Sequence, residues 1–143
     1  KRLNELHYVR PLPEDDGSAV PDAFKKINLS LTSFFDLSLN IEGNMLTLTG
    51  KDGEIWYRAE RGCWSKISRK VHCSPFYTEK DSMDTPVIGA WGVKNGVLTI
   101  RVYEIEFLEE DTLTLTEEED GIHVSFTNTT IPSNPREYVK KVI

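Results

Sequence analysis

The sequence is poor in the residues from which metal and redox sites are usually built. It contains two cysteines and three histidines in 143 residues. Two cysteines cannot form a disulfide framework or a four-thiolate zinc site. No apolar run approaches the ~20 residues that a membrane helix requires. We therefore expect neither a disulfide-stapled scaffold nor a membrane span.

Basic residues are also in the minority. Seventeen Lys and Arg stand against 23 Asp and Glu, which gives a net charge of −6. A surface that follows phosphates needs clustered basic side chains. We therefore expect no nucleic-acid partner.

The signatures of serine acylating enzymes are missing as well. No Ser is followed by Lys three positions later, and neither Gly-x-Ser-x-Gly nor Lys-Ser/Thr-Gly occurs. Cys63 and Cys73 stand ten positions apart, and free thiols are favoured over a disulfide between them. His72 and Cys73 are adjacent, so on a strand they would point to opposite faces and could not form a Cys-His pair. We expect no catalytic residue in this chain.

Metal ligands show no recognisable spacing. His7, His72 and His123 are not related by any metal-binding interval. The acidic runs 109–111 and 117–120 lack the ordered oxygen spacing of a calcium loop. We interpret them as solvated faces, and we expect no metal ion and no cofactor.

What the chain does contain is alternating apolar and polar residues interrupted by turn signals. Two β-rich runs, 87–93 and 97–104, flank Lys94-Asn95-Gly96, and two more, 113–116 and 122–126, flank a link that ends in Asp120-Gly121. An Asn-Gly or Asp-Gly pair between alternating runs is a strong hairpin signal, because both turn positions favour positive φ. The stretch from Val87 to Asn128 therefore predicts two hairpins.

The same pattern starts at Phe24. Period-two alternation runs through 27–32, 37–42, 45–49 and 54–58, with turns at 42–44 and 51–53. Further strands are expected at 63–67, 76–78 and 136–143, and a loop at 81–86. No helical period is sustained. The sequence predicts an all-β fold: an antiparallel meander that closes into a lipocalin-like barrel of about eight strands, with a β-sandwich as the alternative.

The length suits one domain. Residues 1–23 are predicted to be an interdomain linker or N-terminal lead-in, because prolines, Gly and Asp crowd positions 11–21. Within this lead-in only Leu3, Leu6, Tyr8 and Val9 are expected to dock. Residues 24–143 would form the barrel.

Aromatic side chains are the candidates for a ligand cavity. Trp56, Tyr57, Trp64 and Tyr103 could line the mouth of a barrel, whereas Trp91 is expected to be part of the core. Glu104 and Glu106 lie two apart on a predicted strand, ~7 Å from each other, a spacing at which paired carboxylates could act on glycosides. Two carboxylates on an acidic rim are the simpler interpretation.

Several of these segments together resemble a known domain. The resemblance lies in Gly89-Ala90-Trp91, the strand 97–104 that leads to Phe107, and Leu113-Thr114-Leu115-Thr116, with weaker support from 39–48, 52–53 and 62–64. They are similar to the C-terminal accessory domain of bacterial serine hydrolases related to class C β-lactamases and penicillin-binding proteins. Gly89, Trp91, Glu104 and Phe107 match its motif positions, although Ile105-Glu106 replaces the Thr-Pro frequent in that family. The resemblance covers roughly residues 36 to 130.

The resemblance implies a non-catalytic barrel that follows a serine hydrolase domain in the same polypeptide. The catalytic Ser, Lys and Tyr would belong to that preceding domain. The implied partners are the catalytic domain and, as an option, a second copy in a homodimer, and the implied location is extracytoplasmic or in the cell envelope. Two rival hypotheses remain: a stand-alone lipocalin-like binder of a small apolar ligand, and a glycan-acting enzyme that uses Glu104 and Glu106.

Overall fold

The computed structural model describes residues 11–32, 35–50, 55–72, 82–104, 109–128 and 136–140. One short 3-10 helix, η1 (Asp22–Phe24), precedes the strands. The strands are β1 (Lys26–Thr32), β2 (Phe35–Glu42), β3 (Met45–Thr49), β4 (Ile55–Arg61), β5 (Ser65–His72), β6 (Ser82–Lys94), β7 (Val97–Glu104), β8 (Glu109–Glu118), β9 (Gly121–Asn128) and β10 (Arg136–Lys140).

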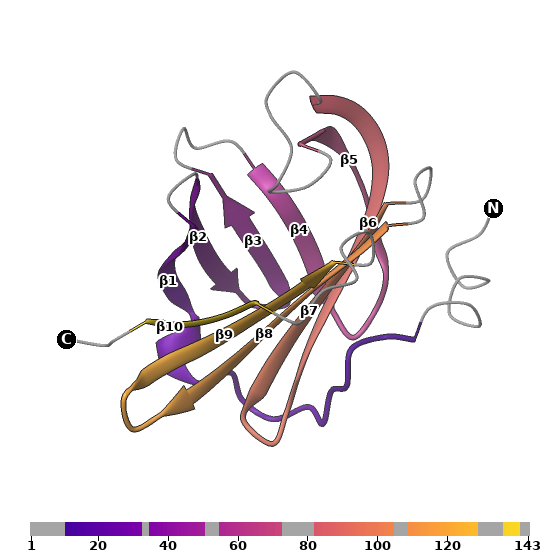
Figure 1. Ribbon diagram of the computed structural model, residues 1–143. Coiled ribbons are helices and arrows are strands. Elements are labelled where there is room, and N and C mark those ends of the chain that lie inside the picture. Colours follow the sequence, from indigo (N-terminus) through magenta and orange to yellow (C-terminus); the bar gives the residue numbers. More distant parts are fainter. Residues whose placement is uncertain are drawn as a thin grey trace.

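These ten strands belong to one sheet. Neighbours in sequence are neighbours in space along β1-β2-β3-β4 and along β6-β7-β8-β9-β10. The sheet curls so that β7 to β10 cross in front of β1 to β4 (Figure 1). The all-β class and the antiparallel meander are thereby confirmed. The curled sheet forms a half-barrel, which is consistent with a lipocalin-like barrel.

The meander is interrupted once, at β5. The end of β4 pairs in parallel with β6 through Glu60↔Ala90 and Arg61↔Trp91, whereas β5 turns away and pairs antiparallel with the first half of β6. Gly89 lies where β4 and β6 approach each other: a Cβ on this residue would come within 2.6 Å of the carbonyl oxygen of Arg58. Gly89, one of the four motif positions, is therefore required for steric reasons, because only a residue without a side chain fits there.

The predicted loop at 81–86 is wrong over its described part, because β6 already begins at Ser82. Pro86 pairs with Ser68 on β5, and the β7 pairing starts only at Val87. Pro86 thus lies just beyond the region where β6 has strands on both sides. A proline that donates no hydrogen bond is tolerated in such a position. The strand expected at 76–78 and the turn expected at 51–53 lie outside the described residues.

The core fills the inside of the curl. Alternate residues of β1 to β4 and β6 to β9 point inward and form one apolar cluster, which includes Phe24, Leu46, Trp91, Ile100 and Leu115. Trp91 is fully buried, as predicted, and its indole Nε1 donates to the carbonyl oxygen of Asn44 at 3.0 Å. Such a continuous apolar interior is the main source of stability for a domain of this size.

A second, smaller cluster lies on the opposite face of β6 and β7. It consists of Trp64, Ile88, Ala90 and Tyr103, and Leu12 packs against it. Leu12 belongs to the lead-in segment (residues 11–21), which passes the β6–β7 hairpin on its way to η1 (Figure 1). The lead-in segment therefore covers apolar surface of the barrel. Docking was expected only of Leu3, Leu6, Tyr8 and Val9, which lie outside the described residues, but Leu12 and Val20 also pack on the barrel.

Candidate functional site

A polar pair is enclosed in the main core. Tyr57 on β4 donates a hydrogen bond from its hydroxyl group to a carboxylate oxygen of Asp111 on β8. Both residues are only 5% exposed. Asp111 occupies an inward position of β8, and the next two inward residues along the strand are the buried Leu113 and Leu115. A buried carboxylate needs such partners, so this hydrogen bond connects strands that are far apart in the sheet order.

The lead-in segment is held by a second set of polar contacts. Arg61 at the end of β4 reaches Asp15 Oδ1 through its Nη2 at 2.9 Å, and its Nε lies 3.2 Å from both carboxylate oxygens. The amide nitrogen of Asp16 donates to the carbonyl oxygen of Val93 at 2.9 Å. Arg101 Nη1 donates to the carbonyl oxygen of Pro11 at 2.9 Å. The lead-in segment is thus attached to β4, β6 and β7.

The charges of Asp15 and Asp16 are stabilised by these contacts. The hydrogen bond from Arg61 lowers the pKa of Asp15 below its usual value. Hydrogen bonds from Ser18 and from the amide of Asn95 lower the pKa of Asp16 to about 2. When the two carboxylates are ionised, they therefore stabilise the lead-in segment in its attached position.

A third group of side chains gathers at the tip of the β8–β9 hairpin. His123 pairs across the strands with Thr116, and Glu118 follows two residues later on the same outward face. Side chains diagonal to one another on antiparallel strands come within reach of each other when they are long. Asp120 lies in the turn, three residues before His123, and its carboxylate folds back onto the ring. The strand register therefore explains why these three residues meet.

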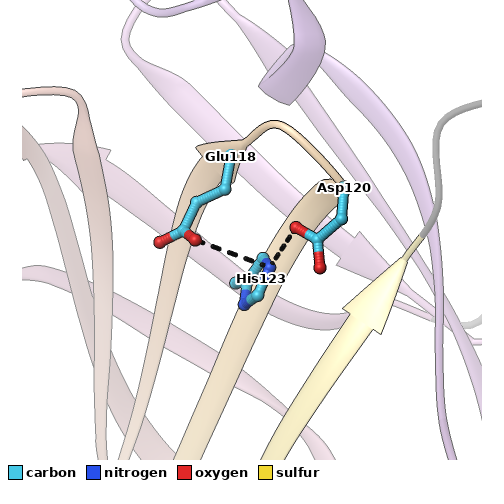
Figure 2. A group of neighbouring side chains, drawn as sticks. All are labelled: Glu118, Asp120 and His123. Carbon is cyan, nitrogen blue, oxygen red and sulfur yellow. Dashed lines mark hydrogen bonds and ion pairs between the residues drawn. The ribbon is translucent and has the colours of Figure 1, made fainter.

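Distances within this hairpin cluster (Glu118, Asp120 and His123) are short. His123 Nε2 lies 2.6 Å from Asp120 Oδ1 and 3.7 Å from Glu118 Oε2. One ligand-type atom from each residue lies within 4.8 Å of the others. Figure 2 shows the two carboxylates directed toward the His123 ring. An imidazole nitrogen and two carboxylate oxygens are ligand types that divalent metal ions accept.

The turn beside this cluster differs from its sequence prediction. The Asn95-Gly96 turn behaves as expected, with φ of 52° and 78°. In the β8–β9 hairpin, Glu118 pairs with Gly121, so Glu119 and Asp120 occupy the central turn positions. Gly121 has a φ of 137°, and Asn95 alone among the described non-glycine residues has a positive φ. The shift by one residue places Asp120, rather than Gly121, at the tip beside His123.

A shallow groove lies next to the hairpin cluster. It has a volume of about 590 Å³, and its lining consists of Pro21, the residues Asn95, Gly96 and Val97, and the run from Thr116 to Glu119. Glu118 belongs both to the groove and to the hairpin cluster. This end of the barrel therefore presents consecutive carboxylates around an open depression.

Of the four aromatic residues proposed as ligand-binding, the three with described side chains do not converge. Tyr57 lies in the main core, whereas Trp64 and Tyr103 lie together in the cluster on the opposite face. Trp56 belongs to β4, but its side chain is outside the described part. Tyr57 is thus separated by the sheet from the other two described candidates.

The motif positions and the acidic pair are only partly described. Gly89 and Trp91 are buried in β6. Glu104 ends β7, paired with Val87 and Glu109, but its side chain is not among the described ones, and Glu106 and Phe107 lie outside the described residues. The proposed Glu104–Glu106 arrangement stays a prediction.

Cys63 is a free thiol, as favoured from the sequence. It donates a hydrogen bond to Glu60 Oε2 at 3.0 Å. This contact, together with burial, raises the pKa of the thiol. A raised pKa lowers the thiolate fraction and hence the reactivity. Cys73 lies outside the described residues.

Comparison of the chain with protein-family models, with curated proteins and with solved structures yields no match. The described part of the chain contains no helix capable of spanning a bilayer. The class of this protein is therefore defined by its fold alone: it is an all-β half-barrel domain.

The hairpin cluster was not predicted from the sequence, because the three histidines show no metal-binding interval among themselves. The available signal was a His three residues after an Asp and five after a Glu, across a predicted tight turn. The pair of Asp15 and Arg61 was not predicted either, because a contact between residues 46 positions apart leaves no local pattern.

Proposed function

We propose that this chain is a non-catalytic β-barrel module that packs on a serine hydrolase domain of the same polypeptide. The proposal rests on the motif resemblance, and the attachment of the lead-in segment is the structural observation that supports it. Leu12 covers the outer apolar cluster, and Asp15 is bound to the Arg61 guanidinium. A domain preceding the lead-in segment would be kept close to β6 and β7 and would not move freely on a linker.

The packed interior supports this role over that of a small-ligand binder. Side chains from eight strands meet in one apolar cluster, and the described aromatic candidates lie on two different faces of the sheet. A lipocalin-like binder needs an apolar cavity with converging polar groups. The outer surface and the ends of the barrel are then the surfaces left for contact with a partner domain.

The first test is the coding sequence upstream of Lys1 and the protein it specifies. We expect a Ser-x-x-Lys and a later Tyr-x-Asn/Ser motif there, and we expect the extended protein to resist limited proteolysis between its two domains. A variant with Arg61→Gln should be cleaved faster within residues 11–21, because it loses the contact to Asp15. The matched control is Arg58→Gln, which makes the same charge change at an exposed position of β4.

Two outcomes would overturn the proposal. The first is an upstream sequence without hydrolase motifs. The second is saturable binding of a small apolar molecule that is lost on mutation of a core residue such as Leu48, which would favour the stand-alone binder.

A further inference from the structure

We propose that the hairpin cluster of Glu118, Asp120 and His123 binds a divalent transition-metal ion of the Zn²⁺ type. The ligands would be His123 Nε2, a carboxylate oxygen of Asp120 and a carboxylate oxygen of Glu118. The inference does not depend on the role proposed for the domain. The hairpin cluster has an imidazole between two carboxylates, whereas the acidic run 109–111 contains carboxylates alone.

The distances are close to those of a metal site. Zn²⁺ bonds of 2.0–2.2 Å to nitrogen and oxygen place tetrahedral ligands about 3.4 Å apart. The Nε2–Oε2 distance between His123 and Glu118 is 3.7 Å, and the Nε2–Oδ1 distance between His123 and Asp120 is 2.6 Å. Binding requires the Asp120 carboxylate to withdraw by less than ~1 Å, while Glu118 approaches slightly. The metal ion then replaces the hydrogen bond between Asp120 and His123.

The backbone holds the ligands in place before the ion arrives. Thr116↔His123, Glu117↔Ile122 and Glu118↔Gly121 form consecutive pairs of the β8–β9 ladder. The inward neighbours Leu115, Ile122 and Val124 are buried in the core. Only side-chain rotations are needed, so little backbone conformational entropy is lost on binding.

Charge and exposure fit the same ion. Glu117, Glu118, Glu119 and Asp120 are four consecutive acidic residues in a chain of net charge −6. A divalent cation reduces their mutual repulsion. The side chains of His123, Glu118 and Asp120 are 34%, 58% and 60% exposed. Solvent can therefore fill the remaining coordination positions, as in sites with three protein ligands.

The donor set predicts selectivity. Imidazole nitrogen favours Zn²⁺, Ni²⁺, Cu²⁺ and Co²⁺, whereas Mg²⁺ and Ca²⁺ prefer all-oxygen sites. We expect one-to-one binding of Zn²⁺ that an excess of Mg²⁺ or Ca²⁺ does not displace. A purely electrostatic acidic patch would respond to all of these divalent ions alike.

The experiment is calorimetric titration of the full chain, without an affinity tag, with ZnCl₂ near neutral pH. Titration with CoCl₂, followed by its visible absorption, is the second measurement. His123→Gln should weaken Zn²⁺ binding at least about tenfold, and Glu118→Gln and Asp120→Asn should act in the same direction. His7→Gln should bind Zn²⁺ as the parent does.

Glu117→Gln is the matched control, because it removes the same charge from the neighbouring position but not a ligand. Retained Zn²⁺ affinity in this variant, together with its loss in Glu118→Gln, supports the site. Equal losses in both variants, an unchanged affinity in His123→Gln, or no saturable binding by the parent would each overturn the proposal. Should His123→Gln fail to fold, as judged by circular dichroism, the Glu118/Glu117 comparison decides alone.

Discussion

At the scale of single residues, the least expected feature is a carboxylate inside the core. Asp111 is buried and accepts a hydrogen bond from Tyr57. Burial of a polar group is tolerated when its hydrogen bonds are made, and leaving one unmade is expensive. The pair therefore contributes to the specific register between distant strands as well as to stability.

Tyr57→Phe removes the donor and keeps the ring. We expect a loss of about 1–3 kcal/mol in the free energy of unfolding, because Asp111 then lacks one of its hydrogen bonds. Urea denaturation measures this loss. In a double-mutant cycle with Asp111→Leu, the two losses should be non-additive by at least ~0.5 kcal/mol. Additive losses would show that the two side chains do not interact in solution.

Gly92 provides a second prediction at this scale. A Cβ on Gly92 would lie 2.6 Å from the carbonyl oxygen of Glu14 and 2.7 Å from Asp15 Cβ. Gly92→Ala should push the lead-in segment away from β6, with a loss of about 1–3 kcal/mol in stability. Faster proteolysis within residues 11–21 is the direct measurement. An alanine variant as stable and as resistant to proteolysis as the parent would show that the lead-in segment does not lie this close to Gly92.

At the scale of elements, the lead-in segment acts as an additional layer on β6 and β7. Its attachment combines apolar contacts of Leu12 with the hydrogen bonds of Asp15 and Asp16. Arg61, which binds Asp15, also lies over the Trp91 ring, 5.3 Å from its centroid. One guanidinium thus connects the lead-in segment to a fully buried residue of the core.

The attachment should depend on pH in a defined direction. The pKa values of Asp15 and Asp16 are lowered from 3.8 in the folded protein, that of Asp16 to about 2. A lowered folded-state pKa adds stability above the unfolded value, and this contribution is lost as the pH falls through the folded value. We therefore expect the stabilisation to be complete above about pH 4–5 and to disappear as the pH falls toward 2.

Thermal unfolding of the parent and of Asp15→Asn between pH 6 and pH 2 measures this effect. The variant should be less stable near pH 6, and the difference should shrink on acidification. Glu14→Gln removes only an exposed ion pair with Lys94, in which the charged groups lie 3.6 Å apart, and should stay close to the parent. A difference in stability between parent and Asp15→Asn that does not change with pH would show that the charge of Asp15 does not stabilise the attachment.

At the scale of the whole molecule, the proposed role gives a plain expectation. The chain produced on its own should not hydrolyse nitrocefin or p-nitrophenyl esters, because the nucleophile would belong to the preceding domain. Spectrophotometric assays of repurified protein measure this. Turnover that survives repurification would contradict the accessory-domain proposal.

The strands and hairpins could be predicted because their cause is local. Alternation of apolar and polar side chains defines the buried face, as in 45–49 and 122–126, and Asn95-Gly96 supplies the positive φ that its hairpin turn requires. The overall class of fold follows from many such local preferences. The same reasoning failed at 82–86, where pairing with β5 outweighed the proline signal.

Only the tertiary structure decided which distant residues meet. The parallel contact of β4 with β6, the Arg61–Asp15 pair and the Tyr57–Asp111 hydrogen bond join residues 30 or more positions apart. Within the β8–β9 hairpin, a one-residue shift of the turn placed Asp120 beside His123. Local periodicity determines which face a side chain occupies, but the curl of the sheet and the register of its strands determine its neighbours.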